Sequence, residues 1–269
     1  IMPYRAAGND ARHQIKLGLA TSKDGINFVR KSDKPAFEGH HDDPDGGCAE
    51  DPRLMKIDGV YYLTYAARPY APGRYWLPYE QRSEGAKAWK RPHADSEPWF
   101  LRTNETLTYL AITKDFVTYK RLGRITDARE DDRDVVIFPR KINGKFYMIS
   151  RPVIDGDRSM WISSSDDLME WRTRQKLYSG VEEWESGRVG AGCPPIETED
   201  GWVLIYHGVS KTDSCYRVGL MLLDKEKPEK ILARTKDFVL EPAADYEKSG
   251  LYQGCVFPTG AVVKDGTLY

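Results

Sequence analysis

A repeated pair of β-hairpins constrains the fold of this chain more than any other feature of its sequence. In the first hairpin pattern, an apolar strand reaches a glycine turn that follows an acid or amide, and an aromatic-rich strand comes next. Four copies of this pattern lie at residues 52–65, 138–149, 195–206 and 257–269. Asp-Gly and Asn-Gly between apolar runs are strong hairpin signals, so each copy predicts two antiparallel strands.

A second hairpin pattern follows each of the first three copies. It consists of a strand, a turn that contains Asp, and a strand that ends in aromatic or basic residues. The copies cover residues 108–121, 160–172 and 218–232, and a similar hairpin lies near the start of the chain at 15–29. Paired hairpins that recur in this way are typical of β-propellers, which have four strands in each blade.

We therefore predict an all-β chain and a five-bladed β-propeller that forms a single catalytic domain over residues 1–269. Residues 2–6 look like the end of an inner hairpin, so the first blade lacks its opening strand, and the last blade stops after its opening strands. We expect residues beyond one or both ends to close the ring. A β-sandwich has similar strand spacing and is the alternative fold.

Composition narrows the class of ligand. The formal net charge is -1, so the chain lacks the excess of basic residues that would indicate nucleic acid or an anionic membrane surface as a partner. The chain has 16 Tyr, 7 Trp and 8 Phe, which suits a β-rich core and the stacking of rings on sugars. Its four cysteines, Cys48, Cys193, Cys215 and Cys255, form no metal-ligand spacing, so we expect free thiols and a cytoplasmic location.

Two segments interrupt the repeats. Residues 34–47 include His40-His41-Asp42-Asp43, where a solvated loop is favoured over a metal site because no regular element fixes the spacing. Residues 66–102 form a long insertion that is rich in aromatic and basic residues, among them Tyr75, Trp76 and Trp89. An insertion of this length indicates a functional loop over the mouth of the propeller or a contact within a homo-oligomer.

Glu50 and Asp51 stand directly before Pro52, at the start of the apolar run that leads to the turn at Asp58-Gly59. This position aims a reactive carboxylate from a rigid sheet into a cleft, although a simple turn cap is the alternative. Similar polar residues occur at the ends of other inner strands, and in a propeller these ends converge on one funnel. They are Arg5, Glu50, Asp51, Arg53, Arg133, Asp134, Arg151, His207 and Tyr216.

Buried Arg and His are costly unless they are paired. Two Arg and one His around a single cleft would form an anion site, because guanidinium groups match phosphate oxygens. For any one of these residues, a structural ion pair with a nearby carboxylate is the alternative explanation.

Six motifs in this sequence resemble glycoside hydrolase family 130 (GH130), and they run the length of the chain. They are Gly-Cys-Ala-Glu-Asp-Pro-Arg at 47–53, Phe-Pro-Arg-Lys-Ile-Asn-Gly-Lys-Phe at 138–146, Ser-Arg-Pro at 150–152, Gly-Cys-Pro-Pro-Ile at 192–196, Tyr-His-Gly-Val at 206–209 and Val-Phe-Pro-Thr-Gly-Ala-Val at 256–262. The resemblance implies a five-bladed propeller and an activity as a β-mannoside phosphorylase or, in some members, a β-mannosidase.

The same resemblance assigns roles to individual residues. Asp51 matches the general acid of the family, and Arg5 matches a residue that contacts the mannosyl unit. The positions that match phosphate ligands are Arg133, Arg151, His207 and Tyr216. We add Glu50, Arg53 and Asp134 as candidate substrate-binding residues because they face the same funnel. The family's Ala-Ala-Asp carboxylate would lie beyond Tyr269.

These residues predict an inverting glycoside phosphorylase that converts a β-mannoside and phosphate to α-mannose 1-phosphate. A phosphorylase needs one acid and a cationic site for phosphate, whereas an inverting hydrolase needs a second carboxylate as base. The lead-in Gly46-Gly47-Cys48 and the insertion indicate the mannosyl-glucose branch, with β-1,4-mannosyl-glucose or manno-oligosaccharides as substrates. No metal or organic cofactor is expected, only inorganic phosphate as co-substrate.

Two rival functions stay open from the sequence alone. A β-mannosidase of the same family would use one of the acids Asp132, Glu182, Glu183 or Glu185 as base, and would be periplasmic or secreted. A non-catalytic glycan-binding propeller is the other rival, since the turn at residues 22–28 resembles the structural Asp-box of sialidase-type propellers.

Overall fold

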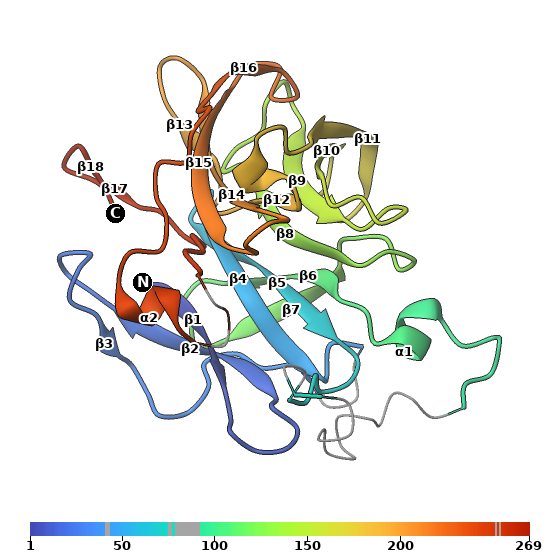
Figure 1. Ribbon diagram of the computed structural model, residues 1–269. Helices are drawn as coiled ribbons and strands as arrows, with labels where there is room; N and C mark the ends of the chain where they lie inside the picture. Colours follow the sequence, from blue (N-terminus) through green and yellow to red (C-terminus); the bar gives the residue numbers. More distant parts are fainter. Residues whose placement is uncertain (41–43, 75–76, 79–91, 251, 253) are drawn as a thin grey trace. The chain divides into compact units, whose positions relative to one another are not determined.

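The computed structural model describes residues 1–40, 44–74, 77–78, 92–250, 252 and 254–269 (Figure 1). Its regular structure is almost entirely β-strand. The chain divides into two compact units, which are described separately. Unit 1 comprises Ile1–Leu54, Asp58–Asp131 and Val262–Tyr269, and unit 2 comprises Met55–Ile57 and Asp132–Ala261.

Unit 1 contains two antiparallel sheets and one short ribbon. The first sheet has the order β1-β2-β3, with β1 at Met2–Ala7, β2 at Ile15–Thr21 and β3 at Val29–Arg30. The second has the order β4-β5-β6-β7, with β4 at Cys48–Ile57, β5 at Val60–Arg68, β6 at Leu107–Thr113 and β7 at Tyr119–Arg124. The ribbon pairs β17 (Val263–Lys264) with β18 (Thr267–Leu268), and helix α1 spans Trp99–Thr103.

Unit 2 contains two further sheets, drawn in green to orange in Figure 1. One has the order β11-β10-β9-β8, with β8 at Asp132–Ile137, β9 at Phe146–Pro152, β10 at Met160–Ser165 and β11 at Trp171–Tyr178. The other has the order β12-β14-β15-β16, with β12 at Arg188–Ala191, β14 at Trp202–Val209, β15 at Tyr216–Leu223 and β16 at Ile231–Arg234. Strand β13 (Ile196–Glu197) also pairs with β14, the 3-10 turn η3 spans Glu183–Glu185, and helix α2 spans Asp245–Lys248.

The glycine turns form as the sequence predicts. Both residues of Asp58-Gly59 have positive φ, at 48° and 81°, and Asn143-Gly144 has 49° and 80°. Asp265-Gly266 is similar, at 51° and 73°. Positive φ at both central positions matches the twist of the flanking strands, and Asn, Asp and Gly tolerate it best. Three of the four predicted hairpins therefore have this turn, and the fourth pairs β13 with β14 through a turn in which Gly201 has a φ of 148°.

The Asp turns of the second pattern share one hydrogen-bonding scheme. In the first sheet, the Asp24 carboxylate accepts the main-chain N–H of Ile26 and Asn27 at 2.9 and 2.8 Å. Asp115 and Asp167 make the same two bonds to the residues two and three positions later. An Asp that bonds its own following backbone stabilises the turn locally, so the repeat in the sequence reflects a repeat in the structure.

Each unit has its own apolar core. In unit 1 the core includes Leu17, Phe37, Leu63 and Tyr65, and Trp99 of α1 packs against it. In unit 2 it includes Phe138, Trp202 and Tyr206, with the Phe138 and Trp202 rings edge to face at 5.2 Å.

The all-β prediction is confirmed, and the described chain forms four sheets of the blade type. Three are meanders of strands that follow one another in sequence, and in the fourth β12 pairs with β14 while β13 lies off this path. Among the described residues, a two-stranded ribbon of β17 and β18 is found where a fifth sheet is expected. The count of five blades therefore remains a prediction. The insertion begins later than predicted because β5 continues to Arg68. Its aromatic residues Tyr75, Trp76, Tyr79 and Trp89 lie outside the described residues, as do His41, Asp42 and Asp43.

Candidate active site

Two polar clusters contain all of the predicted site residues, one in each unit. The Asp51 cluster of unit 1 comprises Arg5, Glu50, Asp51, Arg53 and Arg68. The Asp134 cluster of unit 2 comprises Arg133, Asp134, Arg151, Arg188, His207 and Tyr216.

Asp51 lies within β4 with a φ of 50°. Left-handed backbone is uncommon for residues other than Gly, and when it occurs within a strand it redirects the side chain. The Arg53 guanidinium, which is only 1% exposed, supports this backbone because its Nη1 donates to the Asp51 carbonyl at 3.0 Å. Arg53 thus contacts the main chain beside the candidate acid.

Arg5 of β1 bridges both adjacent carboxylates. Its Nη1 donates to Asp51 Oδ1 at 2.9 Å, and its Nη2 lies 3.1 Å from Glu50 Oε2. The Asp51 side chain is 19% exposed, and its second oxygen, Oδ2, makes no hydrogen bond within the described part of the chain. One carboxylate oxygen is therefore fixed by Arg5, and the other is available to a ligand.

Glu50 is more deeply buried than Asp51. Its Oε1 lies 3.6 Å from Arg68 Nε and 3.9 Å from the Cys48 sulfur. Burial raises the pKa of the Cys48 thiol above its usual range, and the neighbouring Glu50 charge raises it further. Cys48 is therefore a buried, protonated thiol beside Glu50.

The Asp134 cluster begins at a β-bulge. Arg133 pairs with Arg151 across β8 and β9, but Val136 pairs with Ile149, so β8 has one extra residue between these two positions. Asp134 occupies the bulge with a φ of 54°. Bulges redirect side chains and are common beside active sites.

Arg151 and His207 both face the Asp134 carboxylate. Arg151 Nε donates to Asp134 Oδ2 at 2.6 Å, and His207 Nε2 lies 3.5 Å from the same oxygen. The Arg151 main-chain N–H donates to Asp132 at 3.0 Å. Among the residues that the structure describes, the terminal nitrogens Nη1 and Nη2 of Arg151 have no hydrogen-bond partner. Arg151 is thus anchored through Nε and can present its fork to an anion.

The rings of Tyr216 and Phe257 pack against His207, and Tyr216 also contacts a further arginine, Arg188. The Tyr216 ring lies 5.7 Å from the His207 ring, and Phe257 packs against both at 5.7 and 4.6 Å. The Arg188 guanidinium donates to the Tyr216 hydroxyl and lies 4.9 Å above its ring. Burial raises the pKa of Tyr216 while Arg188 lowers it, with burial the larger effect. These contacts therefore involve two arginines, a histidine and a protonated tyrosine, and Arg133 is placed beside them by its strand pairing with Arg151.

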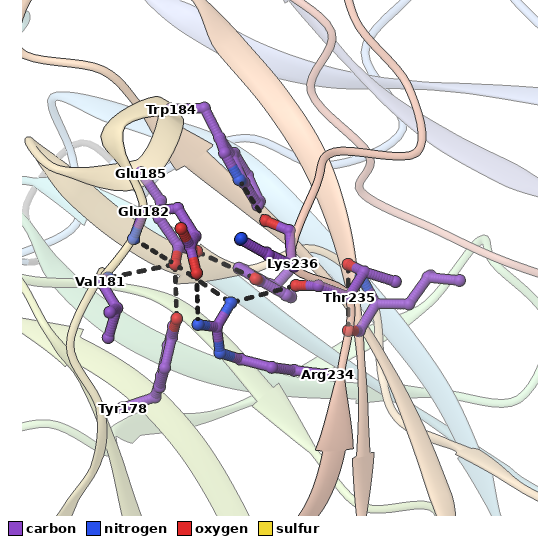
Figure 2. Close-up of polar contacts among 10 residues, drawn as sticks. Tyr178, Val181, Glu182, Trp184, Glu185, Arg234, Thr235 and Lys236 are labelled. Carbon is purple, nitrogen blue, oxygen red and sulfur yellow. Dashed lines mark hydrogen bonds and ion pairs between the residues drawn. The ribbon is translucent and has the colours of Figure 1, made fainter.

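The four acids that a hydrolase would need as base are engaged in structural contacts. Asp132 accepts the Arg151 N–H, and Glu183 accepts the Ser210 hydroxyl at 2.5 Å. Figure 2 shows the other two: Glu182 pairs with Arg234 at 2.8 Å, and Glu185 accepts bonds from Tyr178 and the Val181 N–H. Glu185 is fully buried and its two oxygens already accept hydrogen bonds, an environment unlike that of a base that activates water.

Sequence reasoning missed three contributors to these clusters: Arg68, Arg188 and Gly190. The sequence position of Arg188 could have identified it. Arg188 is the first residue of the strand Arg188–Ala191, and Arg133 likewise lies near the start of β8. Gly190 pairs with His207 across β12 and β14, and an added Cβ there would lie 2.4 Å from Asp134 Oδ2. Only the structure reveals this close approach.

Comparison with known proteins places the chain in a family. A family model described as beta-1,4-mannooligosaccharide phosphorylase matches residues 1–97 and 102–269. This chain belongs to glycoside hydrolase family 130. Within the family, it is 38% identical over 255 residues to a 1,2-beta-oligomannan phosphorylase of Thermoanaerobacter sp. (strain X514), an alignment that covers 94% of this chain and 73% of that relative.

A solved GH130 structure agrees with this assignment. The beta-1,2-mannobiose phosphorylase of Listeria innocua, in complex with beta-1,2-mannobiose, superposes with a TM-score of 0.76 at 33% identity. The match covers 95% of this chain and 62% of that chain, so this sequence spans less than two thirds of the solved protein. The 4-O-beta-D-mannosyl-D-glucose phosphorylase of Bacteroides fragilis is more distant, at 25% identity over 187 residues, with 64% of this chain and 47% of that relative covered.

Proposed function

We propose that this protein is an inverting β-mannoside phosphorylase that uses inorganic phosphate to release α-mannose 1-phosphate. The observation that supports the proposal best is the state of Arg151. Asp134 holds its Nε, and its two terminal nitrogens have no partner among the described residues. A fork anchored in this way suits the bidentate recognition of phosphate oxygens.

The proposed roles follow from the chemistry of each cluster. Phosphate, held by Arg151, Arg133, His207 and Tyr216, attacks the anomeric carbon while the glycosidic C–O bond breaks. Asp51 gives its proton to the leaving oxygen, directly or through the mannosyl 3-hydroxyl, and regains one from phosphate. Arg5, Glu50 and Arg53 are proposed to bind the sugar or fix Asp51. No metal or organic cofactor is required.

The proposed substrate is a β-mannoside whose leaving group is another sugar. The relatives named for 1,2-linked mannosides are more similar to this chain than the one named for mannosyl-glucose, at 38% against 25% identity. We therefore favour β-1,2-linked oligomannosides and retain β-1,4-mannosyl-glucose and manno-oligosaccharides as the other candidates. The proposed fold is a five-bladed propeller.

The experiment is an assay of the purified protein with each mannoside in the presence and absence of phosphate. Phosphate-dependent formation of α-mannose 1-phosphate is the expected result. Release of free mannose at the same rate without phosphate would contradict the proposal and favour the hydrolase. Glycan binding without turnover in either buffer would favour a binding protein.

A further inference from the structure

Asp134 is enclosed by the side chains that it contacts. Its own side chain is 4% exposed, and those of Arg151 and His207 are 9% and 1% exposed. Both neighbours meet the same oxygen, Oδ2, at 2.6 and 3.5 Å. A carboxylate used in this way offers little surface to a sugar hydroxyl.

The backbone around Asp134 is arranged for this contact. The bulge in β8 and the positive φ of 54° direct the carboxylate toward β9 and β14. Gly190 of β12 leaves space for Asp134 and His207 to approach each other. An added Cβ there would lie 2.4 Å from Asp134 Oδ2 and 2.6 Å from His207 Cε1. Strained backbone and a close glycine converge on one contact, which indicates that its geometry matters beyond simple packing.

The contact determines which atoms Arg151 can offer to a ligand. Nε is held by Asp134 and the main-chain N–H by Asp132. Rotation of the guanidinium would break the 2.6 Å bond to a buried carboxylate, which is a costly loss. The Nη1 and Nη2 fork is therefore held in one orientation before any anion arrives.

We propose, building on the phosphorylase function above, that Asp134 is a positioning residue that acts on phosphate through Arg151 and His207. In this role it touches neither the sugar nor the phosphate. The sequence predicts that Asp134 binds substrate, and this role and a positioning role have different consequences. A positioning role changes the affinity for phosphate, whereas a sugar-binding role changes the affinity for the mannoside.

The test compares Asp134→Ala and Asp134→Asn with a matched control, Asp45→Asn. Asp45 is also a buried carboxylate that accepts from an arginine Nε, that of Arg121 at 3.3 Å. It belongs to unit 1, and among the described residues its polar partners are His40, Tyr65 and Arg121, none of which is in either cluster. The measurements are KM for phosphate, KM for the mannoside, and the binding of inorganic phosphate by calorimetry.

In Asp134→Ala we expect phosphate to bind about 10- to 100-fold more weakly, because a displaced fork loses its alignment with the anion. The KM for the mannoside should stay within about twofold of the wild type. Asp134→Asn keeps an oxygen that can accept from Arg151 Nε, so it should recover part of the phosphate affinity. Asp45→Asn should lower the melting temperature and leave phosphate binding unchanged.

A higher KM for the mannoside with unchanged phosphate affinity would overturn the proposal in favour of sugar binding. An equal loss of phosphate affinity in Asp45→Asn would overturn it in favour of general destabilisation. If Asp134→Ala does not fold, an Asp134→Asn variant that binds phosphate as tightly as the wild type overturns it.

Calorimetry with phosphate keeps this proposal distinct from the proposed function. A wild-type protein that binds phosphate but cleaves no β-mannoside contradicts only the function. An Asp134→Ala variant that binds phosphate as the wild type does contradicts only the role of Asp134.

Discussion

The Asp51 and Asp134 clusters contain similar Asp–Arg pairs but leave different atoms available to a ligand. Each has an aspartate in a strand at positive φ, 50° and 54°, with an arginine on one carboxylate oxygen. The Asp51 side chain is 19% exposed and its Oδ2 is available to a ligand. The side chain of its partner, Arg5, is 33% exposed. Asp134 is 4% exposed, and the atoms left available belong to its partner, Arg151.

Burial does not separate the two pairs, since the arginine is the more exposed member of each. The difference lies in the atoms that stay available within the described part of the chain: an oxygen of the acid in unit 1, and the terminal nitrogens of the arginine in unit 2. The proposed function therefore assigns the same residue types to proton donation in one cluster and to anion binding in the other.

Removal of the acid of unit 1 should give the largest effect. Asp51→Asn keeps the shape and the bond to Arg5 but cannot donate a proton, so kcat should fall by about 10²- to 10⁴-fold. Phosphate binding, measured by calorimetry, should be unchanged because that site belongs to the other cluster. Retained turnover would show that Asp51 is not the acid, and loss of phosphate binding would show that the clusters do not have separate roles.

The next largest effect should come from the arginine of unit 2. Arg151→Ala removes the fork, and we expect about a 10²-fold loss in kcat/KM for phosphate. Arg151→Lys keeps the charge without the fork and should lie between this variant and the wild type. Kinetics at varied phosphate and saturating mannoside measure the loss. Full activity in Arg151→Ala would leave phosphate without its proposed ligand.

A smaller effect should come from Gly190, which touches the pair without taking part in chemistry. In Gly190→Ala the new methyl group meets Asp134 Oδ2 and the His207 ring, and we expect about a tenfold rise in KM for phosphate as they separate. Gly260→Ala is the control, because an added Cβ there has nothing within 4 Å. Equal behaviour of the two variants would mean that the Asp134–His207 contact has no influence on phosphate.

Asp213 and Arg217 form an Asp–Arg ion pair outside both clusters. The small stability that this pair contributes is the reference for the pairs in the two clusters. Hydrogen bonds from Arg217 and from the Cys215 N–H lower the pKa of Asp213 from 3.8 to about 2. A depressed carboxyl pKa adds stability above pH 3.8, and this stability disappears as the pH falls toward 2. Because the Asp213 side chain is 42% exposed, the contribution should be below about 1 kcal/mol.

Asp213→Asn should therefore weaken the protein slightly at pH 5 and have no effect near pH 2, with catalysis unchanged throughout. Urea unfolding at several pH values checks the slope. A larger loss at low pH than at neutral pH would contradict the assigned direction.

Much of the fold could be predicted because it rests on local chemistry. Asp58-Gly59 and Asn143-Gly144 specify their turns through backbone preferences, and Asp115 and Asp167 through bonds to their own following residues. Signals of this kind need only a few neighbouring residues, so one sequence is enough to detect them.

The site was predictable in residue type but not in arrangement. The repeats and motifs identified Asp51, Arg151 and His207 as polar residues at strand ends. The pairing of Arg151 with Asp134 depends on a bulge between Arg133 and Val136, which shifts the register by one residue. Registers between strands and close approaches such as that of Gly190 are set by tertiary packing, and the sequence alone carries no local signal of them.

The most direct test of the account is a crystal structure of the protein with mannose and phosphate bound. The account predicts phosphate oxygens within hydrogen-bond distance of Arg151 Nη1 and Nη2, with the Nε bond to Asp134 intact, and the Asp51 carboxyl on the other side of the sugar ring. Phosphate bound away from Arg151, or a sugar that lies out of reach of Asp51, would contradict it.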